Sequence, residues 1–226
     1  MSSALPDIIP LFPLPNAVLF PRMPLPLHVF EPRYRAMVRD AARGSRLIGM
    51  ALLCGDWERD YYGRPPVFPT GTVGEMVHVE ELTDGRFNIV LRGLREYSIV
   101  RELEGAPYRE AAVMWRPSVR GPLPAEMRTS IAREMHRYLT RIGRASAPEE
   151  MLKGSVDDET FVNFLAQHLD VPPLEKQALL EAPTLDERAS RLLDAIVFRL
   201  EELRTGHAGP PPMPSDPGPA KRATLP

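Results

Sequence analysis

Hydrophobic positions in the first half of the chain recur in short runs whose spacing predicts β-strands. Residues 47–54 (LIGMALLC) are almost all apolar, which is typical of a strand buried on both faces. In residues 86–92 (RFNIVLR) apolar and polar side chains alternate, so one face of this strand should be buried. Before it, Thr83-Asp84-Gly85 indicates a tight hairpin, because Asp-Gly adopts the positive φ angles that hairpin turns require. Similar runs predict further strands at 8–14, 25–30, 73–79, 94–103 and 108–116.

Prolines interrupt the first of these runs, at Pro10, Pro13 and Pro15. Because proline lacks an amide donor, we expect this strand to lie at a sheet edge or to contain a bulge. A single helix should follow the second run, since Pro32 suits a first helical position and Gly44 ends the helical spacing. Six or seven short strands with close connections and one helix favour a small barrel or a sandwich.

The spacing of apolar residues changes from 2 to 3.6 after Pro117, which predicts helices in the second half of the chain. Helical apolar faces are expected over 123–142 and 161–169, followed by a short helix near 174–181 and a last helix over 184–205. The remaining segment is rich in proline and glycine. It cannot bury enough apolar surface to offset its chain entropy, so we expect a disordered tail.

Polar residues at the starts of two predicted helices are expected to cap them. Asp157 or Asp158 should cap the helix over 161–169, and Thr184 with Glu187 forms a capping box before the last helix. The patterns divide the chain into four parts: an N-terminal extension (1–6), a β domain (7–117), a helical domain (121–205) and the Pro/Gly-rich tail (206–226).

Composition and charge exclude several classes of protein. Hydrophobic residues make up 43% and charged residues 26% of the 226, close to the average of globular proteins. The formal net charge of −2 gives no field that would attract nucleic acid or an anionic membrane. No run approaches the ~20 apolar residues of a membrane span, and the N-terminus lacks the features of a secretory signal. We therefore expect a soluble cytoplasmic protein.

Few side chains are placed for catalysis or metal binding. The single cysteine, Cys54, cannot form an intramolecular disulfide or a cysteine metal site, and we expect an inert core thiol. The five histidines lack the spacing of a metal site, so neither a metal nor a cofactor is expected. A hidden hydrolase would need a perturbed acid–base pair in a pocket, and the sequence reveals none.

Charged residues on the predicted strands and helix allow two interpretations. Four arginines lie on neighbouring strands, but four glutamates interleave with them, so a solvated mixed face is favoured over a nucleic-acid surface. Glu31 and Arg33 could grip a peptide, but a helix cap and an ion pair are favoured. The arginines are Arg92, Arg95, Arg101 and Arg109, and the glutamates are Glu96, Glu102, Glu104 and Glu110.

Several segments resemble a known family. Residues 8–38 (IIPLFPLPNAVLFPRMPLPLHVFEPRYRAMV) look like the opening of the N-terminal substrate-binding domain of Lon proteases, a domain that also occurs alone in many bacteria. Further matches follow in the same order: LIGMALL (47–53), GTVGEMVHVEELTDGRFNIVLRGLREYSI (71–99), PYREAAV (107–113) and KQALLEAPTLDERASRLLDAI (176–196). The resemblance spans about residues 7–204.

The resemblance implies an α+β fold, with a PUA-like β pseudo-barrel carrying one short helix and a C-terminal helical bundle. In the full protease an ATPase module and a serine–lysine peptidase follow, and we expect neither here. The sequence has no G-x-x-x-x-G-K-[ST] segment for a nucleotide phosphate, and the chain should end where the ATPase begins. Lys153 and Ser155 flank Gly154 in an expected loop, where a solvated pair is favoured over a catalytic dyad.

The function implied by the resemblance is non-catalytic recognition of unfolded or exposed polypeptide segments, with no nucleic acid and no membrane as partners. A protease or chaperone machine could be a further partner. The alternative function, by analogy with other PUA folds, is nucleic-acid binding. In the loop over 55–70, the aromatic side chains could face a partner or cover one end of the barrel. The expected binding residues are Leu19, Phe20 and Met23 of the proline-rich segment and Trp57, Tyr61, Tyr62 and Phe68 of this loop.

Overall fold

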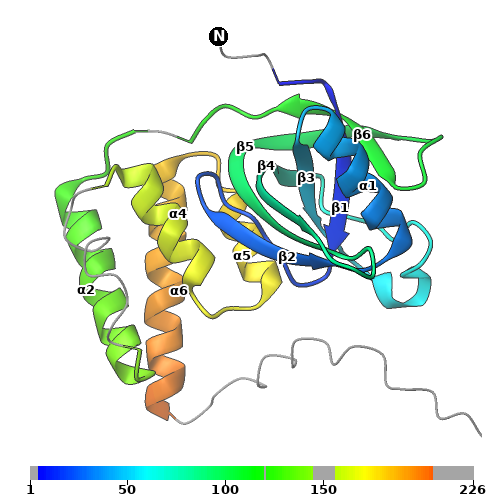
Figure 1. The fold of residues 1–226 in the computed structure, drawn as a ribbon. Helices are drawn as coiled ribbons and strands as arrows, with labels where there is room; N and C mark the ends of the chain where they lie inside the picture. The colour runs from blue at the N-terminus through cyan, green and yellow to red at the C-terminus, as the bar shows by residue number, and fades with distance from the viewer. Residues whose placement is uncertain (1–4, 120, 145–155, 206–226) are drawn as a thin grey trace, which may run out of the picture.

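The computed structural model describes residues 5–119, 121–144 and 156–205, and within them the chain is a mixed α+β fold (Figure 1). The six strands of the described residues are β1 (Ile8–Leu14), β2 (Pro24–Val29), β3 (Leu47–Leu52), β4 (Thr70–Glu81), β5 (Phe87–Leu103) and β6 (Arg109–Trp115). The helices are α1 (Pro32–Arg43), α2 (Ala125–Arg141), α4 (Asp158–His168), α5 (Pro173–Leu180), α6 (Leu185–Thr205) and the 3-10 turn η1 (Trp57–Asp60). The expected tail (206–226) and the pair Lys153 and Ser155 lie outside the described residues.

The six strands form one sheet in the order β2-β5-β4-β3-β1-β6, and an additional pairing of β5 with β6 closes it on itself. Closure is possible because β5 is 17 residues long, so its first half pairs with β2 and its second half with β6. The sequence pattern predicted two strands, at 86–92 and 94–103, where the structure has this single strand. Gly93 lies between them, and a Cβ there would be 2.2 Å from the carbonyl oxygen of Phe20. The glycine lets the segment before β2 cross β5.

Contrary to the expectation of an edge or a bulge, β1 lies inside the sheet and its registers with β3 and β6 are uninterrupted. It pairs antiparallel with β6 through residues 8–11 and parallel with β3 through residues 11–14, so each half of the strand has one free side. Successive residues of a strand point their backbone N–H and C=O groups to opposite sides, and the hydrogen bonds at the two ends of β1 show which side each residue faces. The nitrogen of Pro10 therefore faces away from β6, and that of Pro13 faces away from β3. Neither proline therefore removes a hydrogen bond of the sheet.

Helix α1 and the helices after β6 each bury an apolar stripe against the strands or against one another. In α1 the buried residues follow the expected helical spacing and pack with strand residues such as Phe12, Ile48 and Ile89. A second cluster unites the two halves of the chain, since Phe20 and Met23 from the segment before β2 pack with α4, α5 and α6. No helix in the described ranges is long and apolar enough to cross a membrane.

The expected caps are found, one of them in part. Asp157 caps α4, where its carboxylate accepts a hydrogen bond from the Thr160 amide at 3.1 Å. Thr184 Oγ1 accepts from the Glu187 amide at 3.2 Å, which is the first half of the expected capping box. The carboxylate of Glu187 instead pairs with Arg191, one turn further along α6.

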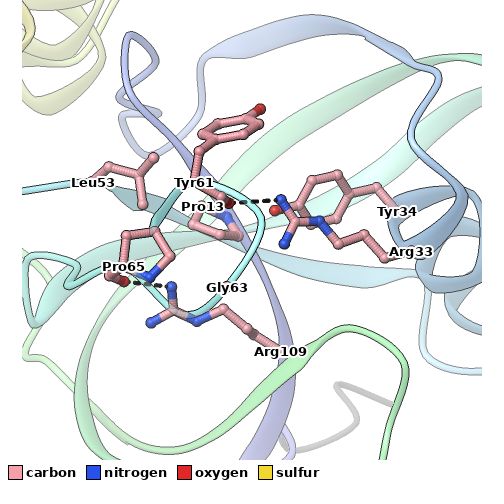
Figure 2. Close-up of a pocket in the computed structure, with 8 residues that line it drawn as sticks. All are labelled: Pro13, Arg33, Tyr34, Leu53, Tyr61, Gly63, Pro65 and Arg109. Carbon is pink, nitrogen blue, oxygen red and sulfur yellow. Dashed lines mark hydrogen bonds between the residues drawn. The ribbon is translucent and has the colours of Figure 1, made fainter. Parts of the chain in front are cut away.

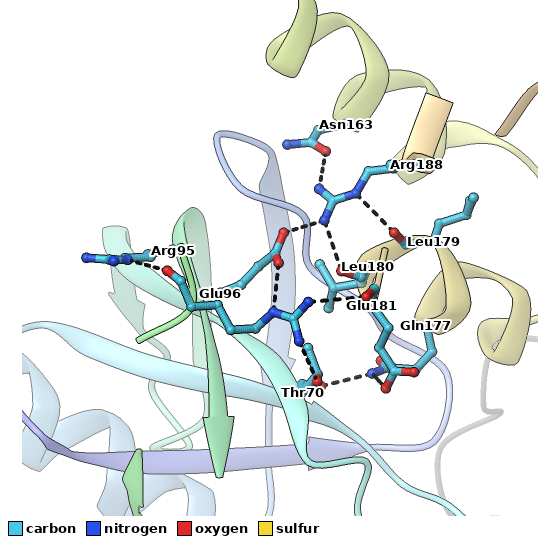
Figure 3. Close-up of polar contacts among 10 residues, drawn as sticks. Thr70, Arg95, Glu96, Asn163, Gln177, Leu179, Leu180, Glu181 and Arg188 are labelled. Atoms are coloured by element: carbon cyan, nitrogen blue, oxygen red, sulfur yellow. Dashed lines mark hydrogen bonds and ion pairs between the residues drawn. The ribbon is translucent and has the colours of Figure 1, made fainter. Parts of the chain in front are cut away.

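A buried polar network joins the helices to the barrel (Figure 3). Arg188 of α6 is fully buried, and its guanidinium donates to Glu96 Oε1 of β5 at 2.6 Å and to Asn163 Oδ1 of α4 at 2.7 Å. It also donates to the carbonyl oxygens of Leu179 and Leu180, at 3.0 and 2.9 Å. Burial raises the pKa of the Glu96 carboxyl, and the charge of Arg188 opposes that shift.

Two further contacts belong to the same network. Gln177 Nε2 of α5 donates to the carbonyl oxygen of Thr70 at 2.9 Å, and Arg116 donates to the carbonyl oxygen of Glu181 at 3.2 Å. These polar groups lie beside the apolar cluster that the two halves share, so barrel and helices are held together by both kinds of contact.

Candidate functional site

The two ends of the loop that joins β3 to β4, residues 52–54 and 66–68, are paired with each other, and we call this paired base the neck. Leu53 and Val67 form an isolated antiparallel bridge, the Cys54 amide donates to the carbonyl oxygen of Pro66 at 2.9 Å, and the Phe68 amide donates to that of Leu52 at 2.9 Å. These contacts set the register at the base of the loop. The residues between them form a loop that is bonded to the start of α1 and to β5 and β6.

Aromatic side chains gather in residues 57–62 of this loop. The Trp57 and Tyr61 rings lie 6.0 Å apart and the Tyr61 and Tyr62 rings 5.2 Å apart, both in edge-to-face arrangements. Tyr62 is 86% exposed, whereas Trp57 and Tyr61 are half-buried. We call these three residues the aromatic tip. In Figure 1 the loop (cyan) lies at the end of the barrel away from the helices α2, α4 and α6.

One side of the aromatic tip is bonded to the start of α1. Arg33 donates to the carbonyl oxygen of Tyr61 at 3.1 Å (Figure 2) and to that of Tyr62 at 3.3 Å. The Tyr61 hydroxyl donates to Glu31 Oε1 at 2.8 Å. Arg33 also pairs with Glu31 at 3.1 Å. Burial and the hydrogen bond to Glu31 raise the pKa of the Tyr61 hydroxyl, which therefore stays protonated as a donor.

The outcome for Glu31 and Arg33 differs from the expectation in one respect. The ion pair between them is present, but the Glu31 side chain makes no capping hydrogen bond to α1. Its carboxylate faces Arg33 and the Tyr61 hydroxyl instead, and Pro32 already supplies a first helical residue that needs no acceptor. The loop, which is distant in sequence, thus determines the orientation of this carboxylate.

The other side of the loop is bonded to β5 and β6. Arg109, which is buried, donates from Nη1 to the carbonyl oxygen of Pro65 at 2.8 Å, and its guanidinium pairs with Glu102. Arg64 donates to the carbonyl oxygen of Leu103 at 3.3 Å. Sequence reasoning placed Arg109 only among the mixed strand charges. Its partner across the hairpin, Glu102, is one of the interleaved glutamates. Nothing in the sequence indicated the bond from Arg109 to the loop.

A narrow recess beneath the loop leaves no room for a water molecule (Figure 2). Its lining is shared by the loop, β1 and the two arginines: Pro13, Arg33, Tyr34, Leu53, Tyr61, Gly63, Pro65 and Arg109. Both guanidiniums are already bonded to loop carbonyls and to carboxylates, so the recess offers no free charged donor to a ligand. We interpret it as the packing between loop and barrel.

The remaining expected binding residues lie elsewhere. Phe68 is half-buried and packs on the cluster that the barrel shares with the helices. Leu19, Phe20 and Met23 are buried, with exposed fractions of 1%, 0% and 3%, so the expectation of an exposed apolar segment is wrong for these side chains. They are buried because the segment before β2 lies between the strands and the helices, where the Phe20 amide also bonds to Gln167.

Other candidates for chemistry have structural contacts. Cys54 is half-buried rather than buried, and burial raises the pKa of its thiol, which disfavours the reactive thiolate. Among the described residues, no group of three or more histidine, cysteine or acidic side chains could hold a metal ion. Arg92 pairs with Glu75 at 2.7 Å, and Arg95 donates to the carbonyl oxygen of Arg116 at 2.8 Å.

Comparison with known proteins gives consistent matches. The family model described as the ATP-dependent protease La (LON) substrate-binding domain matches residues 8–197. Lon protease 2 of Myxococcus xanthus is 27% identical over 206 residues, covering 88% of this chain and 24% of that protein. Lon protease of Paraburkholderia phytofirmans is 30% identical over 214 residues, covering 90% of this chain and 26% of that protein. The chain thus spans about a quarter of the length of these curated relatives.

Solved structures match the fold as well. A Lon N-terminal domain protein from Xanthomonas campestris has a TM-score of 0.63 and 25% identity, covering 83% of this chain and 97% of that one. The N-terminal domain of Lon protease from the Mycobacterium avium complex has a TM-score of 0.64 and 20% identity, covering 84% and 98%. The resemblance inferred from the sequence is confirmed, and the chain belongs to the family of ATP-dependent protease La (LON) substrate-binding domains.

Proposed function

We propose that this chain is a non-catalytic module that binds unfolded or exposed polypeptide segments, with the aromatic tip as part of its binding surface. The family description, a substrate-binding domain of a protease, supports polypeptide as the ligand class. The observation that carries the site is Tyr62, an aromatic side chain 86% exposed on a backbone that is hydrogen-bonded on both sides.

Aromatic side chains on a fixed loop suit this function for a physical reason. Tyrosine and tryptophan bring large contact areas with few rotatable bonds, so little side-chain entropy is lost when they bind. An unfolded chain presents apolar side chains in many sequences, and the faces and edges of rings accept them without a fixed hydrogen-bonding pattern. The half-buried Trp57 and Tyr61 would support Tyr62 and limit the motion of its ring.

We also propose that the closed sheet is a PUA-like pseudo-barrel and that the second half of the chain forms a helical bundle, over the extents 7–117 and 121–205. ATP-dependent proteolysis is assigned by name to the longer relatives, and we propose no catalytic step for this chain. A cytoplasmic location and the partner machine stay expectations from the sequence.

The proposal can be tested by measuring binding to a matched pair of ligands. Fluorescein-labelled ribonuclease A, reduced and alkylated so that it stays unfolded, is titrated with the protein by fluorescence anisotropy, and native ribonuclease A serves as the folded comparison. We expect binding to the unfolded form only. Tyr62→Ala should weaken that binding by ~1 kcal/mol or more, the loss typical of an interface anchor.

The matched control removes an exposed aromatic ring at a distance from the loop. Phe198 of α6 is 58% exposed, so Phe198→Ala deletes a similar apolar area and should leave the affinity unchanged. Equal affinities for Tyr62→Ala and the unsubstituted protein would contradict the assigned site. Absence of binding to the unfolded ligand would contradict the function itself.

A further inference from the structure

The backbone at the aromatic tip is held by two arginines from outside the loop. Beyond the neck, Arg33 contacts the carbonyl oxygens of Tyr61 and Tyr62, and Arg109 contacts that of Pro65. The two guanidiniums thus hold three carbonyl groups within a five-residue stretch that immediately follows η1. Arg33 comes from α1 and Arg109 from β6, two elements that are far from the loop in sequence.

We infer that Arg33 and Arg109 are positioning residues of the binding surface, holding the tip so that Tyr62 faces solvent before a ligand arrives. The inference rests on the proposed function, because it assigns a role to the backbone under the same site. Neither arginine contacts the ligand in this proposal. Their effect on affinity arises because a loop already ordered in its binding conformation loses less conformational entropy upon binding.

Arginine is suited to this arrangement by its geometry. The planar guanidinium directs donors to two neighbouring carbonyl oxygens while a third donor, Nε, faces a carboxylate, and Arg33 does this with Tyr61, Tyr62 and Glu31. Arg109 uses its donors differently, with Nη1 on the carbonyl oxygen of Pro65 and both Nε and Nη2 on the carboxylate of Glu102. In each case the carboxylate balances the positive charge, so both side chains can be largely buried. A lysine has a single nitrogen and cannot span the same acceptors.

Aromatic contacts add to the role of Arg33. Its guanidinium carbon lies 4.6 Å from the centre of the Tyr34 ring and 5.7 Å from that of Tyr61, so the cation is held between a buried ring of α1 and a ring of the tip. The Tyr61 hydroxyl reaches the same carboxylate that Arg33 pairs with. Side chain and backbone of Tyr61 are therefore both bonded to the start of α1, which fixes the neighbouring Tyr62.

The two arginines differ in how they can be tested. Arg109 is buried on the strand that closes the barrel, so its removal could unfold the protein. Arg33 retains about a fifth of its side-chain exposure and lies at the first turn of a helix, where alanine is well tolerated. Arg33→Ala and Arg33→Lys are therefore the informative variants. Arg39→Ala is the matched control, since Arg39 on the same helix also pairs with a glutamate and stacks on a ring but is remote from the loop.

Three measurements on the full chain test the inference. Anisotropy gives the affinity for reduced, alkylated ribonuclease A, thermal unfolding reports the stability, and hydrogen exchange by mass spectrometry reports the order of residues 57–64 without ligand. We expect Arg33→Ala to weaken binding about threefold to tenfold. Exchange of residues 57–64 should become faster. Arg33→Lys should show most of the same loss, and Arg39→Ala should leave affinity and loop exchange unchanged.

A double-mutant cycle with Tyr62→Ala separates positioning from direct contact. If Arg33 acts through the placement of Tyr62, it should have little further effect once that ring is absent, so the two losses should not add. Additive losses, or an affinity of Arg33→Ala equal to that of the unsubstituted protein, would overturn the inference while leaving the proposed function intact. If the unsubstituted protein does not bind the unfolded ligand, the proposed function fails as well. Unchanged loop exchange in Arg33→Ala and Arg33→Lys would overturn the inference independently of binding.

Discussion

At the scale of single residues, Arg188 is the most demanding group that the fold buries. A guanidinium removed from water costs several kcal/mol unless its donors are satisfied. Here Glu96 supplies the opposite charge, and Asn163 and two backbone carbonyls of α5 supply further acceptors. The ion pair connects α6 to β5 across 92 positions of sequence. It therefore specifies how the helical half sits on the barrel.

Replacing Arg188 should destabilise the protein strongly. Arg188→Ala leaves the Glu96 carboxylate buried beside only a weaker partner, Arg116 at 3.4 Å, and we expect a loss of about 3–5 kcal/mol in the free energy of unfolding. Urea denaturation followed by circular dichroism measures it. Arg191→Ala, three residues along α6 and partly exposed, should cost less than about 1 kcal/mol. A loss of similar size in both variants would contradict the special role of the buried pair.

The sequence contained part of this information. The apolar stripe of α6 includes Leu185, Ala189 and Leu192, and Arg188 lies on the same face, three residues after the first of them. A charged residue at such a position indicates a buried partner, but nothing in the sequence says which of the glutamates provides it. The aromatic tip is a similar case. The aromatic composition of its loop indicated either a surface for a partner or a cover for the barrel end, and the sequence did not distinguish the two. The burial of Leu19, Phe20 and Met23 depended on tertiary packing that local pattern does not encode.

At the scale of elements, helix caps and strand pairing differ in how local they are. The cap of α4 involves residues three apart, so the sequence predicted it, at Asp157 or Asp158, and the structure has it at Asp157. The pairing of β1 involves β3 and β6, which lie some forty and one hundred residues away, and it could not be predicted. The prolines of β1 predict an edge or a bulge, because a missing amide donor is the same local constraint in either setting. The prolines fit an interior strand here because the two halves of β1 pair with different neighbours, the first with β6 and the second with β3.

Removing the cap of α4 should have a moderate effect. Asp157 accepts from the Thr160 amide and hydroxyl and pairs with Arg22 at 2.7 Å, so Asp157→Ala removes both a cap and a contact to the barrel. We expect a loss of ~1 kcal/mol in the free energy of unfolding, as for other capping residues, measured by urea denaturation at pH 7. An unchanged midpoint would show that α4 is held by packing alone.

The pH dependence of this loss follows from the pKa of Asp157. Burial alone would raise it, but hydrogen bonds from Thr160 and the charge of Arg22 lower it below the ordinary value. Because the folded state holds the ionised form more strongly, the stabilisation is complete above the unfolded pKa of about 3.9 and is lost as pH falls through the folded value. The difference between Asp157→Ala and the unsubstituted protein should therefore shrink below about pH 4. A difference that stays constant down to pH 2.5 would contradict the assignment.

At the scale of the whole molecule, the contacts that join the barrel to the helices lie apart from the loop between β3 and β4. The apolar cluster and the Arg188 network occupy the junction of barrel and helices, while the aromatic tip lies at the barrel end away from α2, α4 and α6 (Figure 1). A ligand at the tip would not need to disturb that junction. Other exposed apolar side chains, such as Val100 and Met114 on the outer face of β5 and β6, offer a different place for a polypeptide to bind.

The central claim is that unfolded polypeptide binds at the aromatic tip, and a hydrogen-exchange footprint tests it most directly. Exchange is measured by mass spectrometry with and without a saturating amount of reduced, alkylated ribonuclease A. We predict slower exchange at residues 55–65 and at the start of α1, with no change in β6. Protection confined to the outer face of β5 and β6, or to the helices, would contradict the claim.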